Sequence, residues 1–479
     1  KTIRNVCSNK FNEASFLKSM NKLLVNCEDK IRTIEPKSVM IFSRNSKEHF
    51  SGGRYHSFMI AEALSMAGHK VYFVSEFIPI FYKDFYNYER HQNIEIVLTK
   101  DFKSDLPNVV VDYIFLTPGM DKYNAFYENA IYLTKKEKAK LILINFESPN
   151  WFNKYSSIKR DVHLWDKWVL VSKYASCILS SAKESTKYAK DFYTQVQSEC
   201  KFLNAYPSIN DNLADIVISK GVTKENRIVM MARFSHAEHK GAYNIPDLLS
   251  KDMGGFTFVL IVGTGNIPKE LYNEIKVKAD RYSIALDIKY KISDYEKFVE
   301  IARAKILLFP TFFEGFGYPP VEAQYMNTHC VTFDLPVLRE VSGCNIHYAR
   351  LGDWQDFKRL VSEIILNYKE VSTNKYIKDI ATVKSFAKRL DNVLGQLENI
   401  KPLDIKTNIV KADILANRVA NENIFSITKS ILKQNRQGNI SNIACVVRIF
   451  SNIFLKKVLS DKMYIKFRSI YHKNFKKGK

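Results

Sequence analysis

The sequence has few cysteines and no long apolar run. Its 7 cysteines, at positions 7, 27, 177, 200, 330, 344 and 445, form no CxxC pair and no His/Cys spacing typical of zinc. This pattern favours a reduced, cytosolic protein over a disulfide framework. No apolar run reaches the roughly 18 residues that span a bilayer, and no signal peptide opens the chain. We therefore expect the protein to meet a membrane only from its surface.

Acidic residues are also scarce. The 479 residues carry 72 Lys and Arg but only 50 Asp and Glu, a net charge of +22. The imbalance is concentrated in residues 401–479, where 17 basic residues face 4 acidic ones. The length predicts two or more domains with sizeable apolar cores. Much of the positive charge therefore belongs to one end of the chain, where it points to an anionic partner.

The most informative stretch is EGFGYPPVE, residues 314–322. It follows the short apolar run from Ile306 to Phe309, which predicts a buried parallel strand. Gly315 and Gly317 allow the backbone to approach a ligand closely, and the two prolines suit the first turn of a helix. A glycine loop that leads into a helix N-terminus favours bound anions. Glu314 and Glu322, on either side of the loop, can accept hydrogen bonds from sugar or ribose hydroxyls.

This motif resembles the Glu-x7-Glu motif of the retaining glycosyltransferases of family 4, which have the GT-B fold. The resemblance implies an α/β protein of two Rossmann-like, doubly wound domains that face each other. It implies that Glu314 orients the transferred sugar and that Glu322 binds the ribose diol. It also implies that the backbone from Gly315 through Phe316 and Gly317 to Tyr318 holds phosphate or sugar hydroxyls.

The first half of the chain predicts βα units. Apolar runs predict strands at residues 38–42, 70–74, 109–116, 140–146 and 167–171, with a helix over 57–67. The loop that contains Gly52 and Gly53 is similar to the family's Gly-Gly turn near the donor phosphates. It is equally consistent with a plain tight turn.

Loops at the carboxyl ends of these strands are the expected acceptor side, because open α/β sheets bind ligands there. Many family 4 members place a histidine after the strand at 140–146, but this sequence has Glu147. Glu147 is a candidate ligand for an acceptor hydroxyl, with helix capping as the alternative. His49 and Asp121 are the other acceptor-side candidates.

The second domain is expected to begin after a turn-rich junction at residues 204–210. The strand RIVMMARFS brings Arg233 to its end, and Lys240 precedes a glycine shortly after, as in the family's diphosphate-binding pair. Two fixed cations would stabilise the charge that builds up on a departing nucleoside diphosphate. The turn at Gly263 resembles a family turn near the nucleotide, and its GxG lacks the rest of an NAD fingerprint.

The expected organisation has five parts. They are an accessory helix at 1–37, an acceptor domain at 38–205, a donor domain at 206–385, a helix crossing back at 386–400 and a basic tail at 401–479. Helices are expected at 354–368 and 377–400, and Glu340 is expected to be structural. The family resemblance covers about residues 38–398.

The tail alternates apolar and cationic positions at helical spacing, with its stripe in residues 440–479. Such a helix can lie in an anionic membrane interface, which would suit a lipid-linked acceptor. It can also pack on its own core or on a second subunit, or bind a nucleic-acid backbone. We favour the membrane and do not expect a nucleic-acid partner.

The sequence therefore predicts a retaining hexosyltransferase that uses a nucleotide-diphosphate sugar and a glycan or lipid-linked acceptor. Family analogy suggests bacterial surface polysaccharide synthesis, of the O-antigen or capsule type, at the inner face of the membrane. The resemblance implies no cofactor and no metal, and the sequence has no Asp-x-Asp motif. The alternatives are a GT-B-like epimerase or phosphorylase, and a non-enzymatic nucleic-acid-binding protein.

Overall fold

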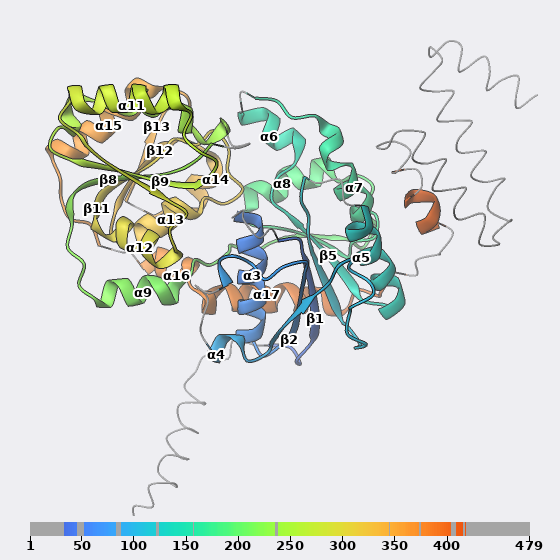
Figure 1. Ribbon diagram of the computed structural model, residues 1–479. Helices are drawn as coiled ribbons and strands as arrows, with labels where there is room; N and C mark the ends of the chain where they lie inside the picture. Colours follow the sequence, from blue (N-terminus) through green and yellow to red (C-terminus); the bar gives the residue numbers. More distant parts are fainter. Residues whose placement is uncertain are drawn as a thin grey trace, which may run out of the picture.

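The computed structural model shows two α/β domains, each built around a parallel sheet (Figure 1). It describes residues 33–45, 52–82, 88–120, 124–156, 158–234, 238–343, 345–372, 375–403, 409–414 and 417. Most of the accessory segment 1–37 and most of the tail, including 440–479, lie outside the described residues. The expectation of two doubly wound α/β domains is confirmed.

The first sheet has seven parallel strands in the order β3-β2-β1-β4-β5-β6-β7. The strands are β1 Ser38–Ser43, β2 Lys70–Ser75, β3 Ile94–Leu98, β4 Tyr113–Thr117, β5 Lys140–Asn145, β6 Cys177–Ser180 and β7 Lys201–Asn204. The helices of this domain are α3 Gly52–Met66, α4 Tyr88–His91, α5 Asn124–Glu137, α6 Pro149–Tyr155, α7 Asp166–Ser172 and α8 Lys183–Phe192, with the 3-10 turn η2 Val162–Trp165.

Helices cover both faces of this sheet, which explains why its central strands are apolar along their whole length. In β1, Val39 and Ile41 enter the core beneath α3, whereas Met40 and Phe42 enter the core beneath α5 and α7. The carboxyl ends of the strands lead into α3, α6 and α8. These helix starts therefore gather at one edge of the sheet.

The second sheet has six parallel strands in the order β10-β9-β8-β11-β12-β13. They are β8 Glu225–Arg233, β9 Thr257–Thr264, β10 Ala285–Tyr290, β11 Ala304–Phe309, β12 His329–Phe333 and β13 Ile346–Ala349. The helices are α9 Asp211–Ser219, α10 Ile245–Leu248, α11 Lys269–Arg281, α12 Asp294–Arg303, α13 Tyr318–Tyr325, α14 Pro336–Val341, α15 Trp354–Leu366 and α16 Lys375–Ala381. Three 3-10 turns are η3 Glu238–Lys240, η4 Ala242–Asn244 and η5 Lys251–Met253.

Three local expectations were wrong. The apolar run at 167–171 is not a strand but part of α7, because Trp168, Leu170 and Val171 are buried from one side of a helix against the first sheet. A five-residue apolar run does not distinguish the two structures. The single helix expected at 377–400 is two helices that are separated at Thr382, whose hydroxyl caps the second. Gly52 and Gly53 form the first turn of α3 and not a free loop.

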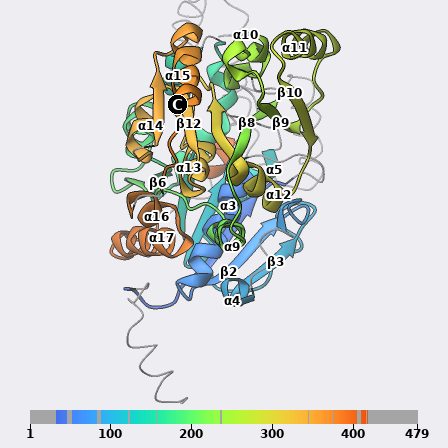
Figure 2. The same cartoon turned by 90° about the vertical axis from the view of Figure 1, so that its left-hand side faces the viewer.

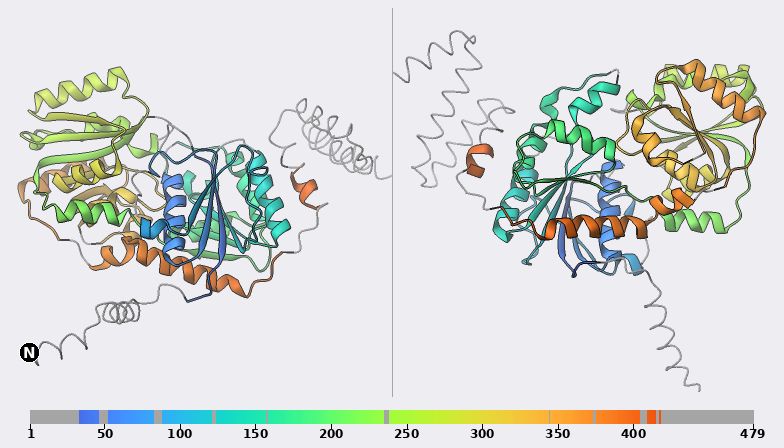
Figure 3. Two further views of the ribbon diagram at one scale, coloured as in Figure 1. Left: turned by 60° about the horizontal axis from the view of Figure 1, so that its bottom comes forward. Right: turned by 180° about the vertical axis from the view of Figure 1, so that it is seen from behind.

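The helix α17 Val383–Glu398 returns from the second domain to the first, where it packs along α3 (Figure 2; Figure 3). The two chain segments that connect the domains lie side by side. The Ile209 amide donates to the carbonyl of Ala381 at 2.9 Å, and the Val383 amide donates to the carboxylate of Asp211 at 3.1 Å. The two domains are therefore connected by two chain segments that are hydrogen-bonded to each other.

Glu340 of α14 joins the domains at the start of α8. Its carboxylate accepts from the amides of Lys183 and Glu184 at 2.6 and 2.9 Å, and from the hydroxyl of Tyr206 at 2.8 Å. A carboxylate at a helix N-terminus satisfies unpaired amides and the positive end of the dipole. Glu340 thus has a structural role in the interface.

Gly315 brings the two domains into backbone contact. A Cβ on Gly315 would lie 2.6 Å from the carbonyl oxygen of Phe146 in the first domain. The carbonyl of Gly315 also accepts a hydrogen bond from the hydroxyl of Ser181 at 2.9 Å. Only glycine therefore allows the loop before α13 to approach the end of β5 this closely.

Gly315→Ala is expected to destabilise this interface by about 1–3 kcal/mol, the usual cost of overpacking. The matched control is Gly52→Ala, because a Cβ there would meet nothing within 4 Å. Thermal unfolding of both variants tests the contact. A melting temperature for Gly315→Ala as high as that of Gly52→Ala would contradict it.

Candidate functional site

The loops after β8 and β11 are tied together at the carboxyl edge of the second sheet. Gly241 has φ +70°, and a Cβ there would lie 2.4 Å from the carbonyl oxygen of Pro310. The amide of Phe312 donates to the carbonyl of His239 at 2.8 Å. The residue between these two contacts is Lys240, so its position relative to the Glu314 loop is fixed by the backbone.

Lys240 and Glu314 form an ion pair, with 2.5 Å between Nζ and Oε1. The Lys240 ammonium also donates to the carbonyl of Phe313 at 3.3 Å. Burial lowers the pKa of Lys240, and the neighbouring Glu314 carboxylate opposes this effect. The ammonium is therefore held in a poorly solvated place where an anion can interact with it strongly.

Arg233 lies at the end of β8, in the same charge cluster. Burial lowers its pKa, the charge of Glu314 opposes that shift, and Gly263 of β9 lies beside its side chain. No ion pair to Arg233 is found among the described residues. Arg233, Lys240 and Glu314, which the sequence predicted to act together, thus lie together. Within the part of the chain that the structure describes, Arg233 forms no ion pair with a carboxylate.

The glycine loop connects this cluster to α13. Gly317 has φ +96°, and a Cβ there would lie 2.4 Å from Leu338 Cδ2, so no other residue fits without displacement. Phe316 is buried, and the hydroxyl of Tyr318 lies 3.1 Å from His56 Nδ1 of α3. The amino ends of α3 and α13 therefore meet across the domain interface.

Gly53 belongs to the same contact. A Cβ on Gly53 would lie 3.1 Å from the ring of Phe146, whose carbonyl faces Gly315. Gly52 and Gly53 thus form the first turn of α3 beside the Phe146 ring, with the Gly315 loop against the backbone of the same residue. Both glycine pairs that the sequence singled out lie at one junction.

Glu322 lies in a second, more buried charge cluster. Its carboxylate pairs with Lys297 of α12 at 2.7 Å, Lys297 pairs with Asp294 at 2.7 Å, and Asp294 accepts from the hydroxyl of Tyr55 at 3.0 Å. Burial raises the pKa of Glu322, and Lys297 opposes this. Sequence reasoning missed Lys297 and Asp294, because an acid and a base three residues apart on a helix are too common to be a signal.

The first domain adds Glu147 and Arg160 to the interface. The Arg160 guanidinium donates to Glu147 Oε1 at 2.7 Å and stacks 3.8 Å from the ring centre of Phe152. Burial raises the pKa of Glu147, and the charges of Arg160, Lys240 and Arg233 oppose the shift. Glu147 is therefore within electrostatic reach of the cations of both domains. Arg160 was missed because it lies in a polar loop without a motif.

The other acceptor-side candidates, His49 and Asp121, lie outside the described residues. No group of three His, Cys, Asp or Glu side chains arranged to hold a metal ion occurs in the described ranges. No helix in the described part of the chain is both long and apolar enough to cross a membrane.

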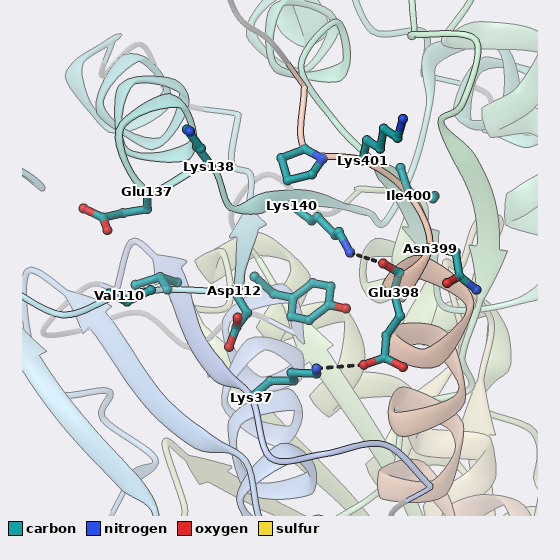
Figure 4. Close-up of a pocket in the computed structure, with 13 residues that line it drawn as sticks. Lys37, Val110, Asp112, Glu137, Lys138, Lys140, Glu398, Asn399, Ile400 and Lys401 are labelled. Atoms are coloured by element: carbon teal, nitrogen blue, oxygen red, sulfur yellow. Dashed lines mark hydrogen bonds and ion pairs between the residues drawn. The ribbon is translucent and has the colours of Figure 1, made fainter.

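A pocket of about 360 Å³ lies at the opposite edge of the first sheet, beside the end of α17 (Figure 4). Lys37 pairs with the Glu398 carboxylate at 2.7 Å, and Lys140 donates to the Glu398 carbonyl at 2.8 Å. Cations at a helix C-terminus satisfy its free carbonyls. These lysines therefore fasten α17 to the sheet, and the pocket is separate from the interdomain cluster.

Two histidines of the interface are buried in their neutral forms. Burial lowers the pKa of His56 to about 3 and that of His239 to about 2. His239 packs edge-on against Phe152 and Phe313, so it connects both domains. Protonation of either imidazole would place a charge in an apolar contact.

Acidification is therefore expected to lower the free energy of unfolding at pH values well above those at which carboxylates titrate. The unfolded chain binds these two protons below about pH 6.5, but the folded chain does not, so stability is complete above that pH and falls as pH decreases toward 3. Each histidine contributes a slope of at most about 1.4 kcal/mol per pH unit.

Urea unfolding at neutral and mildly acidic pH measures this loss. His239→Gln should reduce the pH dependence, whereas the matched control His163→Gln should not, because that side chain is 72% exposed. An equal acid sensitivity in the wild type and His239→Gln would contradict the assignment.

Comparison with known proteins agrees with the two-domain fold. Residues 214–394 match the family model described as glycosyl transferases group 1. Sucrose-phosphate synthase from Thermosynechococcus elongatus is similar with a TM-score of 0.54 and 13% identity, over 75% of this chain and 99% of that one. The N-terminal domain of trehalose-6-phosphate phosphatase from Candida albicans has a TM-score of 0.50 and 9% identity, over 76% and 98%.

Anabaena HepE, solved in complex with UDP and glucose, has a TM-score of 0.49 and 13% identity, over 76% of this chain and 98% of that one. No protein of curated function matches the chain. The narrower assignment to family 4 stays a prediction from the Glu-x7-Glu motif. The chain has the two-domain GT-B fold, and its residues 214–394 match the glycosyl transferases of group 1.

Proposed function

We propose that the protein is a retaining glycosyltransferase that moves a hexosyl unit from a nucleotide-diphosphate sugar to a glycan acceptor. The observation that carries this proposal is the cluster of Arg233, Lys240 and Glu314 beside the glycine loop at the start of α13. The match of residues 214–394 to the group 1 family model supports the same conclusion. An epimerase or phosphorylase would need a similar donor site, but no described feature favours either one.

The donor diphosphate would bind between Arg233 and Lys240. Arg233 has no carboxylate partner among the described residues, so an incoming diphosphate need not break an ion pair to reach it. Lys240 is held by Glu314, and a diphosphate would share that ammonium. As the bond to the sugar breaks, negative charge grows on the departing phosphate, and both cations stabilise it most strongly at that stage.

The sugar and the nucleoside would lie on either side of the diphosphate. We assign Glu314 to the hydroxyls of the transferred sugar and the backbone of the glycine loop to phosphate or sugar oxygens. Glu322 is assigned to the ribose diol, and its pairing with Lys297 would keep it charged and in place. Gly52 and Gly53 would present the first turn of α3 to the donor from the other domain.

Transfer with retention can occur on one face of the sugar. The acceptor hydroxyl oxygen bonds to the anomeric carbon as the bond from that carbon to the phosphate oxygen breaks, and the hydroxyl proton passes to that departing oxygen. No dedicated protein base is then needed. We propose that cationic side chains and helix N-termini take the role that a metal ion has in other transferases.

The acceptor would approach from the first domain, where Glu147 is held by Arg160 at 2.7 Å. We propose that this carboxylate binds an acceptor hydroxyl. The basic tail, with its amphipathic stretch at 440–479, supports an acceptor carried by a lipid and a peripheral location on the inner face of the membrane. Synthesis of a bacterial surface polysaccharide is the setting that fits these features.

Arg233→Ala tests the donor site most cleanly, because its removal leaves no carboxylate without a partner among the described residues. One of UDP, GDP or ADP is expected to raise the melting temperature of the wild type, and this shift should disappear in Arg233→Ala. Turnover with the matching nucleotide sugar should fall by about 100-fold or more.

The matched control is Lys305→Ala at the far end of β11, where the ammonium donates to Asn226 Oδ1 at 2.6 Å and lies over the ring of Tyr368. It should bind the nucleotide like the wild type. Near-normal turnover in Arg233→Ala, or no response of the wild type to any of the three nucleotides, would reject the proposed function.

Glu147→Gln tests the acceptor side. It keeps the shape of the side chain but removes the charge, so the KM for the acceptor should rise about tenfold while the nucleotide-induced thermal shift is unchanged. Glu137→Gln is the matched control, since Glu137 is a similarly buried carboxylate paired with Lys136 at 2.8 Å at the opposite edge of the sheet. An unchanged KM for the acceptor in Glu147→Gln would mean that Glu147 holds Arg160 in place and does not bind the acceptor.

A further inference from the structure

Three aliphatic side chains are exposed within one short segment that follows α6. Ile158 is 48% exposed, Val162 is 53% exposed and Leu164 is 41% exposed. Met120, at the end of the loop after β4, is 36% exposed, and its neighbour Gly119 accepts a hydrogen bond from the indole of Trp168. Single exposed apolar residues are common, but several in seven residues indicate a surface that binds something apolar.

The segment is held in place, so its exposure is a property of the fold. Asn153 of α6 exchanges two hydrogen bonds with the backbone of Arg160, at 2.8 and 3.0 Å. Asp161 caps η2 through the amide of His163, and Trp165 at the end of η2 is fully buried. The aliphatic side chains are therefore presented by a rigid support between two anchors.

The chain returns to this place where the basic tail begins. The short helix at 409–414 packs beside α7 (Figure 1; Figure 3). Val410 and Ile414 enter the same core as Trp165, and Asp413 bonds Lys173 at 3.2 Å and Tyr174 at 2.7 Å. Asn417 donates to the carbonyl of Asp166 at 3.1 Å, one residue after Trp165.

The tail therefore starts next to the exposed segment. Residues 418–479 contain 14 Lys and Arg but only 2 Asp and Glu. An apolar surface near Asn417, from which such a basic sequence continues, complements a lipid bilayer with anionic headgroups, because apolar insertion and attraction to the headgroups add together. A second copy of the same chain would bring a second set of like charges to the surface, which disfavours self-association there.

We propose that the segment from Ile158 to Leu164 is a membrane-docking surface that inserts into an anionic bilayer beside the basic tail. The proposal rests on the proposed function in one respect: it names a lipid as the carrier of the acceptor. Arg160 lies within the docking segment and holds Glu147, so docking would bring the acceptor-side carboxylate to the membrane surface. A lipid-linked acceptor would then reach the interdomain site without leaving the bilayer.

Flotation of the full chain with vesicles tests this surface. The vesicles contain equal parts of phosphatidylcholine and phosphatidylglycerol, with pure phosphatidylcholine for comparison. The test variant is Val162→Asp with Leu164→Asp, which removes apolar contacts and adds charge that anionic lipids repel. Its partitioning into the mixed vesicles is expected to fall at least about tenfold below that of the wild type.

The matched control is Tyr272→Asp with Val277→Asp on α11 of the second domain, where the two side chains are 39% and 58% exposed. It should float like the wild type. Equal flotation of the test variant and the wild type would overturn the proposal, and so would an equal loss in the control. Ile158→Asp alone should also reduce flotation, and it decides the matter if the double variant does not fold.

Two further measurements separate this proposal from its alternatives. Light scattering that shows a dimer in the wild type and a monomer in the test variant, with flotation unchanged, would assign the surface to a second copy and overturn the proposal. The thermal shift with UDP, GDP or ADP reports on the donor site alone. A protein that floats as expected but responds to none of them supports the docking surface and rejects the proposed transferase.

Discussion

The ion pair between Lys240 and Glu314 is the interaction on which the site depends. Burial lowers the pKa of the Lys240 ammonium, and the nearby Glu314 carboxylate opposes that shift. The pair also connects the loop after β8 with the loop after β11. The ion pair forms only if the backbone brings these two loops together, and it in turn holds them in place. The glycines at 241, 315 and 317 make this closeness feasible, because a side chain at any of them would meet a neighbouring atom within 2.6 Å.

Close backbone packing at glycine also joins the two domains. Phe146 faces Gly53 with its ring and Gly315 with its carbonyl, so one residue positions the first turn of α3 and the loop before α13. Around it lie groups from both halves: Glu147 and Arg160 from the first, Arg233 and Lys240 from the second. Neither domain alone carries the complete set of charges, which fits a reaction with two substrates.

Much of this arrangement was predictable from the sequence. The strand that ends at Arg233 contains the apolar run Ile228–Ala232, and the strand that ends at Phe309 is followed by Pro310. Parallel strands place their carboxyl ends at one edge of a sheet. The motif at 314–322 then indicated where the candidate site would lie. Arg160 and Lys297 were not predictable, since their roles arise from contacts over 13 and 25 positions that no local pattern records. The helix α7 was predicted to be a strand because the periodicity of such a short apolar run does not distinguish a helix from a strand.

The paired connection between the domains determines how they can move. The segments that end near Ile209 and Ala381 are bonded to each other, and Asp211 bonds the start of α17. Rotation of one domain relative to the other about these two connecting segments preserves the hydrogen bonds between them. It would separate Gly315 from Phe146, which contact each other across the domain interface. Substrate entry and product exit would then depend on the same rotation of the domains. The helix α17 and the short helix at 409–414 would move with the first domain, on which they pack.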